Sequence, residues 1–311
     1  MILTLTPNSA LDKVIFIEAW TPGKPMRTTQ VVPCVGGKGL DASVTLACLG
    51  VETVALAFLA GENGRQLLRL AEQYGIRCEA VWADGETRLA HVIVERRYHR
   101  HSHIITGELQ IRPEQMARFL ECFRHWVRNA QWVICGGSIP PSALQDLYAH
   151  ILREAEQVGV PVLLDAAGQA VLAAAPHRPT LLKMNRDEFA STFGIQAATL
   201  EAWKAAAQQV YRDLHLNALV LTAGRDGLLA LTPEGGYRVL VPKQKVVNAA
   251  GAGDAASAAL AWRLSQGEAW STALQWAGAV SSASVLTEAT AECRMDDVRR
   301  LLPQVRVTRW A

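Results

Sequence analysis

The feature that most constrains this chain is a regular alternation of short apolar runs with helix-like segments. The apolar runs include MILTL, WVICGG, VPVLLDAA and ALVLTAG, and the segments between them include PEQMARFLECFRHWV and SALQDLYAHILREAEQVG. Short apolar runs bounded by turn residues are typical of buried parallel strands, and the helices supply the crossover connections. The alternation therefore predicts an α/β fold with a doubly wound, mostly parallel sheet and helices on both faces.

A second pattern, found in two separate segments, predicts an additional small sheet. Stretches such as DKVIFIEAW and ETRLAHVIVERRYHRHSHII alternate polar and apolar residues. A period of two is typical of strands in a sheet that has one solvent-exposed face. We therefore expect a β lid formed by about residues 12–35 and 86–105, within a single domain that covers residues 1–311.

Charge and cysteine content narrow the classes of function. The chain has 31 Lys and Arg against 29 Asp and Glu, a net charge of +2. This balance gives no electrostatic reason to expect nucleic acid or an anionic membrane as a partner, so a small molecule is favoured. The six cysteines form no CxxC pair, which favours reduced thiols. Because no signal peptide or apolar run of roughly 20 residues is present, we expect a cytoplasmic protein.

The stretch VVNAAGAGDAASAAL, residues 246–260, contains a candidate catalytic acid. Gly251 and Gly253 permit a tight turn, and the Ala-rich run after Asp254 favours a helix that begins there. Amides at a helix start bind anions. A carboxylate beside such amides suits phosphoryl transfer, because it takes a hydroxyl proton while the amides stabilise the transferred group. Taken alone, Asp254 is equally consistent with a helix N-cap.

Two motifs together indicate a family. GAGD, followed by a small-residue helix, resembles the second signature of the PfkB carbohydrate kinases, which belong to the ribokinase-like superfamily; GGKGLDAS at 36–43 resembles the first. TPNSALD near the N-terminus is most similar to the branch of 1-phosphofructokinases and tagatose-6-phosphate kinases. The resemblance covers nearly the whole chain. It implies a ribokinase-like fold and a sugar kinase that uses ATP and Mg²⁺.

The resemblance also implies roles for residues on the nucleotide side. Asp254 would be the catalytic base, and the amides of Ala252, Gly253 and Asp254 would form an anion hole, with Gly251 shaping the turn. In LLKMNRDEF, residues 181–189, the family pattern Lys-x-Asn-x-x-Glu is present. The remaining nucleotide-side and metal-side positions that it implies are Lys183 at the phosphates, Asn185, Glu188 and Asp165 at the magnesium and its waters, and Thr222, Gly224 and Gly227 at the nucleotide.

On the acceptor side, the resemblance assigns Asp12 to the sugar hydroxyls at the base of the lid. Gly36 and Gly37 would bring the backbone close to the substrate, and Lys38 would add a positive charge suited to a sugar phosphate. Three further positions match those that contact the acceptor phosphate in the sugar-phosphate branch: Arg27, Arg88 and Ser138. Arg27, Arg88 and Lys38 together would supply three cations. Because a neutral acceptor would not need them, a phosphorylated acceptor is favoured.

Two departures from the family pattern affect this acceptor surface. Asp41 stands where the family usually has Asn, and the branch's Arg-x-Asn motif reads Arg88, Leu89, Ala90. The first change adds a charge, and the second removes an amide. A carboxylate about 4 Å from a phosphate charge is unfavourable by a few kcal/mol at an effective dielectric constant near 20, unless Lys38 offsets it.

The sequence leaves several alternatives open. The acceptor could be fructose 1-phosphate, fructose 6-phosphate or tagatose 6-phosphate. A kinase of an unphosphorylated sugar or nucleoside is a second hypothesis, and a ligand sensor without turnover is a third. The alternating strands of the lid favour a homodimer in which two subunits clasp each other's sheets.

Overall fold

A computed structural model describes residues 1–98 and 100–310 of the chain. Positions 99 and 311, which belong to the domain expected over 1–311, lie outside the described residues, and position 99 also falls within the segment 86–105 expected in the lid. Among the helices of the described residues, none combines the length and the apolar character needed to cross a bilayer.

The central feature is a ten-stranded sheet, counted over the described residues. Across the sheet the strands are β16 (Arg306–Trp310), β15 (Gly235–Leu240), β14 (Leu228–Thr232), β13 (Leu219–Thr222), β12 (Leu181–Asn185), β11 (Val162–Asp165), β10 (Trp132–Gly136), β1 (Ile2–Thr6), β4 (Thr53–Leu59) and β5 (Arg77–Trp82). The strands from β13 to β5 are parallel, whereas β14, β15 and β16 extend the sheet as antiparallel neighbours. The prediction of a mostly parallel sheet is confirmed.

Helices cover both faces of this sheet, because successive side chains of each buried strand point to opposite faces. On one face lie α1 (Lys38–Cys48), α2 (Gly61–Gln73), α8 (Ala252–Ser265), α9 (Trp270–Ser284) and α10 (Met295–Leu301). On the other face lie α3 (Pro113–Val127), α4 (Leu147–Gln157), α5 (Gln169–Ala174), α6 (Arg186–Phe193) and α7 (Leu200–Asp213). The alanines of α9, and those of α8 from Ala255 onward, are buried, and small side chains of this kind allow these helices to pack closely on each other and on the strands.

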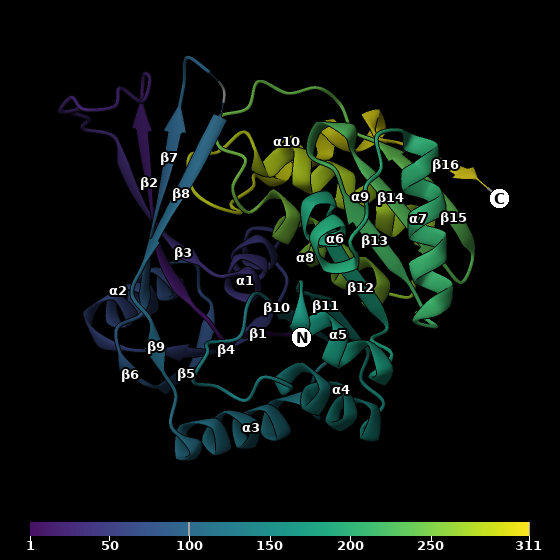
Figure 1. Ribbon diagram of the computed structural model, residues 1–311, viewed down its shortest axis with the longest axis horizontal. Helices are drawn as coiled ribbons and strands as arrows, with labels where there is room; N and C mark the ends of the chain where they lie inside the picture. Colours follow the sequence, from purple (N-terminus) through teal and green to yellow (C-terminus); the bar gives the residue numbers. More distant parts are fainter. Residues whose placement is uncertain (99, 311) are drawn as a thin grey trace.

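A second sheet contains four strands among the described residues, β3 (Val31–Gly36), β2 (Ala10–Ile17), β7 (Arg88–Glu95) and β8 (Arg100–Thr106). β2 pairs with β3 in antiparallel and with β7 in parallel orientation, so segments far apart in the sequence lie side by side. Figure 1 shows this small sheet extending away from the body of the molecule. One of its faces packs against Ala250 and Ala289, which belong to the core domain. The prediction of a small additional sheet is confirmed.

Short elements complete the fold. They are the strand pair β6 (Asp84–Gly85) and β9 (Leu109–Gln110), and the 3₁₀ helices Ala175–His177, Gly224–Asp226 and Leu302–Gln304.

Candidate active site

The carboxyl ends of the parallel strands gather several of the predicted residues at one edge of the sheet. In the strand register, Asp165 at the end of β11 lies beside Lys183 of β12. Asn185, the last residue of β12, lies beside Thr222, the last residue of β13. Parallel strands end at the same edge, so residues that are dozens of positions apart in the sequence lie together at one edge of the sheet.

The start of α8 faces this edge. Gly251 caps the helix in a left-handed conformation with φ of 78°, and the amide of Ala255 donates to the carbonyl of Gly251 at 2.9 Å. The amides of Gly253 and Asp254 precede that bond in the first turn, where helix geometry directs N–H groups out of the helix end. A Cβ atom at Gly253 would lie 3.2 Å from Nζ of Lys183. The anion-binding end of α8 therefore lies next to a lysine of the strand edge.

Asp254 is half-buried at this helix start. Its pKa is raised to about 7, mainly by burial and also by the negative charge of Asp165, against the opposing charges of Lys183 and Lys38. A pKa near the working pH is the best value for a general base, because the group is then deprotonated and still basic enough to accept a proton. The surroundings of Asp254 thus suit proton abstraction.

Asp165 links two lysines. Its Oδ1 atom accepts from Nζ of Lys38 at 2.8 Å, and its Oδ2 atom accepts from Nζ of Lys183 at 2.6 Å and from Oγ of Ser257 at 2.8 Å. Burial by itself would raise the pKa of Asp165, but the charges of Lys183 and Lys38 outweigh it and lower the pKa to about 2. Our sequence analysis missed Ser257; its only signal is its position three residues after Asp254, on the same face of α8.

Glu188 lies at the start of α6, where it takes part in a helix cap. The amide of Glu188 donates to Oδ1 of Asn185 and the amide of Asn185 donates to Oε2 of Glu188, each at 2.8 Å, so the pair forms a capping box. The other oxygen, Oε1, accepts from Nζ of Lys38 at 2.6 Å. The cap therefore orients Glu188 toward the same ammonium group that Asp165 binds.

The oxygen donors at this edge fit a magnesium ion. Within residues 1–98 and 100–310, no three His, Cys, Asp or Glu side chains lie close enough together to enclose a metal. Mg²⁺ does not require such a cage, because it keeps several waters and binds through one or two carboxylates together with the phosphates of a nucleotide. Asp165 and Glu188, which share Lys38, supply such a pair.

The loop predicted to contact the nucleotide follows β13. Gly224 begins a 3₁₀ turn and Gly227 has φ of 81°, where a Cβ atom would clash with the carbonyl oxygen of Val239. Arg186, at the start of α6, pairs with Asp226 of this loop at 2.9 Å. The loop is thereby tied to the helix that carries Glu188.

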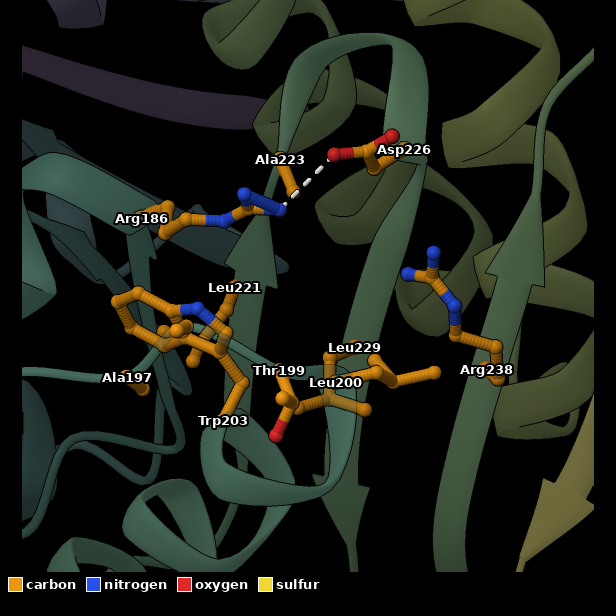
Figure 2. Close-up of a pocket in the computed structure, with 11 residues that line it drawn as sticks. Arg186, Ala197, Thr199, Leu200, Trp203, Leu221, Ala223, Asp226, Leu229 and Arg238 are labelled. Carbon is orange, nitrogen blue, oxygen red and sulfur yellow. Dashed lines mark hydrogen bonds and ion pairs between the residues drawn. The ribbon is translucent and has the colours of Figure 1, made fainter.

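A cavity of about 380 Å³ opens beside the same loop, on the side of α7 (Figure 2). Trp203, Arg186, Leu221 and Arg238 are among its lining residues. Asp254, Lys38 and Asp12 do not line it. The candidate base therefore lies outside this cavity.

On the acceptor side, Asp12 lies in β2 and is 7 % exposed. Gly36 pairs with Ala10 across β2 and β3, and a Cβ atom at Gly36 would clash with the carboxyl group of Asp12 and with the carbonyl oxygen of Ala10, so glycine leaves room for that carboxyl group. Thr290, which our sequence analysis missed and which has no local signal, donates to Asp12 at 3.4 Å. The pKa of Asp12 is raised to about 7, mainly by burial and also by the charge of Asp254, against the lowering effects of the Arg88 charge and of the bond from Thr290. The charge of Asp254 therefore acts on Asp12.

Glycines also set the position of Lys38. Gly37 has φ of 104° and caps α1, so the chain turns sharply into the helix at this point. A Cβ atom at Gly136, the last residue of β10, would lie 2.7 Å from Cβ of Lys38. Because α1 approaches β10 closely at this point, Lys38 lies near the carboxyl ends of the parallel strands.

The structure brings together only part of the cationic group expected at the acceptor phosphate. Lys38 is engaged by the carboxylates of the strand edge, as described above. Arg88 donates to the backbone carbonyls of Asn8 and Ser9. Ser138 accepts a bond from the side chain of Asn8 at 3.0 Å, which links it to the same turn. Arg27 is exposed in the segment 18–30, and no contact in the described part of the chain joins it to this group.

Gly251 permits a test of how tightly the helix start is packed. A Cβ atom at this position would lie 2.5 Å from the amide nitrogen of Ala291, whereas at Gly50, with φ of 72°, it would meet nothing within 4 Å. Both glycines are left-handed, so alanine costs about 1 kcal/mol of conformational energy at either. We expect Gly251→Ala to lower the free energy of unfolding by about 1–3 kcal/mol more than Gly50→Ala, from overpacking. Equal losses in urea denaturation would contradict the close packing.

Comparisons with known proteins show which family this chain is similar to. The family model described as "pfkB family carbohydrate kinase" matches residues 8–297. The 1-phosphofructokinase of Bacillus subtilis (strain 168) is 30 % identical over 310 residues, which cover 99 % of this chain and 100 % of that protein. A possible 1-phosphofructokinase from Thermotoga maritima superposes with a TM-score of 0.90 at 22 % identity, over 100 % of this chain and 99 % of that one.

A more distant structure defines the wider fold. The Arabidopsis thaliana ribokinase complexed with ribose and ATP superposes with a TM-score of 0.76 at 20 % identity, over 97 % of this chain and 98 % of that one. The expected ribokinase-like architecture is therefore confirmed. With the family match over most of its length and a relative at 30 % identity along nearly all of it, this chain belongs to the pfkB family of carbohydrate kinases.

Proposed function

We propose that this protein is a kinase that transfers the γ-phosphoryl group of ATP to a hydroxyl group of a ketohexose phosphate. The observation that carries the proposal is the position of Asp254. It lies at the amide-rich start of α8, close to Lys38 and Lys183 and within electrostatic reach of Asp12. The curated 1-phosphofructokinase from Bacillus subtilis, similar along its full length, supports a phosphorylated ketohexose as the acceptor.

In this proposal each group performs one step of an in-line transfer. Asp12 binds acceptor hydroxyls, and the reacting hydroxyl faces Asp254. Asp254 removes the hydroxyl proton as the new oxygen–phosphorus bond forms and the bond to the leaving ADP oxygen breaks. The amides of Ala252, Gly253 and Asp254 stabilise charge on the transferred group, and Gly251 allows the turn that exposes them.

The nucleotide lies, in this proposal, along the ends of β12 and β13. Thr222, Gly224 and Gly227 bind it through the loop after β13, and Lys183 neutralises phosphate charge. Glu188, Asn185 and Asp165 would hold Mg²⁺ and its waters, and the ion would neutralise charge on the phosphate oxygens. Lys38 then has phosphate oxygens as alternative partners to the two carboxylates that it binds in the described structure.

A screen for ADP release tests the proposed activity. The coupled assay is run with ATP and Mg²⁺ over fructose 1-phosphate, fructose 6-phosphate, tagatose 6-phosphate, unphosphorylated sugars and nucleosides. We expect the highest kcat/KM with one of the ketohexose phosphates. Higher turnover of an unphosphorylated sugar or nucleoside would favour the second hypothesis. No ADP release above the level of an Asp254→Asn variant with any acceptor would favour a sensor.

We also infer that the small sheet mediates a homodimer. Its strand β8 is exposed along its described length, and Ile104 and Ile105 on it are 46 % and 52 % exposed. Trp20, in the neighbouring segment, is 41 % exposed. An exposed edge strand with apolar side chains favours pairing with a second chain. Sedimentation equilibrium should give twice the chain mass, and Ile105→Asp should shift it toward the monomer; a monomeric mass for the unmodified chain would contradict the inference.

A further inference from the structure

Two of the six cysteines, Cys48 and Cys293, meet where α1 contacts the segment 285–294 between α9 and α10. Cys48 is the last residue of α1, and Cys293 lies two residues before the start of α10. Three residues before Cys48, on the same side of the helix, Oγ1 of Thr45 donates to the carbonyl of Ala291 at 2.6 Å. Cys48 also packs against the apolar cluster that contains Cys293. Two thiols that are distant in the sequence therefore share one contact between α1 and this segment.

The two thiols also interact directly. The pKa of Cys48 is lowered, chiefly by a hydrogen bond with the side chain of Cys293 and also by the amide of Cys293, against burial and the charge of Glu292. The same bond is the largest cause that raises the pKa of Cys293, and burial is the next. Negative charge is therefore favoured on the sulfur of Cys48, with Cys293 as the neutral partner.

Cys48 and Cys293 differ in their access to solvent. Cys48 is partly buried, whereas Cys293 is 4 % exposed. The thiolate is the reactive form of cysteine, and a partly exposed thiol with a lowered pKa is typical of reactive cysteines. All six cysteines lie in the described part of the chain, and among them only Cys48 has a lowered pKa. Burial raises the pKa of the four others, which are Cys34, Cys78, Cys122 and Cys135.

We propose that Cys48 and Cys293 are a redox-modification site, which forms a reversible disulfide when a low-molecular-weight disulfide acts as the oxidant. The thiolate of Cys48 attacks one sulfur of the oxidant, whose S–S bond breaks and releases one small thiol that takes up the proton of Cys48. Cys293 then attacks the sulfur of Cys48, the mixed disulfide breaks, and the second small thiol leaves with the proton of Cys293. Two protein thiols are thereby oxidised by two electrons, and the oxidant is reduced to two thiols.

The segment 285–294 also contacts the candidate active site at two points. Thr290 donates to Asp12 at 3.4 Å, and the amide of Ala291 donates to the carbonyl of Ala250, just before the start of α8, at 3.4 Å. Ala291 has φ of 57°, a left-handed conformation that a residue other than glycine seldom adopts. The segment therefore joins the group proposed to bind sugar hydroxyls to the helix start that carries the proposed base.

A disulfide would shift this segment. The sulfur atoms of a disulfide lie about 2.05 Å apart, which is shorter than any hydrogen-bonded contact. Cys48 is fixed at the end of a packed helix, so we expect the segment 285–294 to make most of the movement. Because a misplacement of about 1 Å can lower turnover by about 10²-fold, the disulfide should slow phosphoryl transfer. This consequence, unlike the disulfide itself, rests on the proposed function.

The crosslink is tested without any substrate. The reduced full-length protein is incubated with glutathione disulfide, quenched with acid and measured by mass spectrometry without reduction. We expect the mass of the intact chain to fall by that of two hydrogen atoms, and proteolysis to give peptides linked through Cys48 and Cys293. Dithiothreitol should reverse both changes. No reaction, a stable mixed disulfide on Cys48, a link between two chains or a crosslink of any other cysteine pair would overturn the proposal.

Serine variants assign the roles of the two thiols. Cys48→Ser should abolish the crosslink, and Cys293→Ser should stop at the mixed disulfide on Cys48. Cys78→Ser is the matched control, because Cys78 is also of intermediate exposure, and this variant should crosslink as the unmodified protein does. Thermal melting of each reduced variant checks its fold; if the buried change Cys293→Ser prevents folding, Cys48→Ser and its control decide. A crosslink that persists in Cys48→Ser would overturn the assignment.

Activity is the second measurement. In the coupled assay, complete crosslinking is expected to lower kcat by about tenfold or more, with recovery after dithiothreitol, while Cys48→Ser keeps its activity in the oxidant. An equal loss in Cys48→Ser, or full turnover by the crosslinked protein, would overturn the effect on the active site. A protein that crosslinks but, when reduced, phosphorylates no acceptor would overturn the kinase activity alone. Turnover without any crosslink would overturn the redox site alone.

Discussion

Replacement of Asp254 by asparagine is expected to lower kcat by about 10²- to 10⁴-fold, because the reacting hydroxyl loses its proton acceptor. The amides at the start of α8 and the lysines of the strand edge are unchanged by this substitution, so the KM values for ATP and the acceptor should change little. Asparagine preserves the shape of the side chain and removes a half-buried acid, so the fold should be retained. Steady-state ADP release, with kcat and KM determined separately, measures the effect.

The pH dependence of kcat/KM, compared between the unmodified protein and Asp254→Asn, is the control for this prediction. The pKa of Asp254 is raised to about 7, so the carboxylate that accepts the proton is present above that pH and is lost as the pH falls through it. The unmodified protein should therefore show a decline of kcat/KM below about pH 7, whereas the residual activity of Asp254→Asn should lack the steep part of that decline. A fall of less than tenfold in kcat for Asp254→Asn would contradict the assignment of the base.

Replacement of Asp165 by alanine is expected to lower the free energy of unfolding by about 3–5 kcal/mol, as is typical when one partner of a buried ion pair is removed. Asp165 is 1 % exposed and binds Lys38, Lys183 and Ser257, so its loss leaves two ammonium groups at the strand edge without their shared counter-ion. Urea denaturation at neutral pH measures the change. Activity should fall as well, because both lysines lose their orientation.

Asp226 supplies the control for this prediction. It also pairs with a cation, Arg186 at 2.9 Å, but the side chains are 52 % and 40 % exposed. Exposed pairs contribute about 0–1 kcal/mol, so Asp226→Ala should change stability little. Because the pKa of Asp165 is lowered to about 2, its contribution is present at neutral pH and is lost as the pH falls toward that value, so the two proteins should converge in acid. A loss below 1 kcal/mol for Asp165→Ala would show that the lysines find other partners.

Much of the site was predictable because its signals are local. The family resemblance singled out Asp165 and Asn185, and both lie at the carboxyl ends of strands because each is a polar residue at the end of an apolar run. The glycines around Asp254 indicated a helix start, and α8 begins there. The two family motifs supplied the roles that these positions are proposed to have.

Other features depend on contacts between distant segments, which no local pattern encodes. Thr290 reaches Asp12 across 278 positions, and Ser257 reaches Asp165 across 92. The departures at Asp41 and Ala90 were visible in the sequence, but the absence of an ion pair at Asp41 among the described residues was not. It follows from Lys38 being attracted to carboxylates that are 127 and 150 positions away.

The sequence by itself determined the layered α/β architecture, the small additional sheet and the helix start that contains Asp254, because apolar periodicity and glycine placement act over a few neighbouring residues. Only the tertiary structure decided which charged side chains form ion pairs and which acidic side chains have a raised pKa. The physical reason is that electrostatic energies depend on distance and on the exclusion of water. Both quantities are set when strands and helices from opposite ends of the chain pack around one cleft.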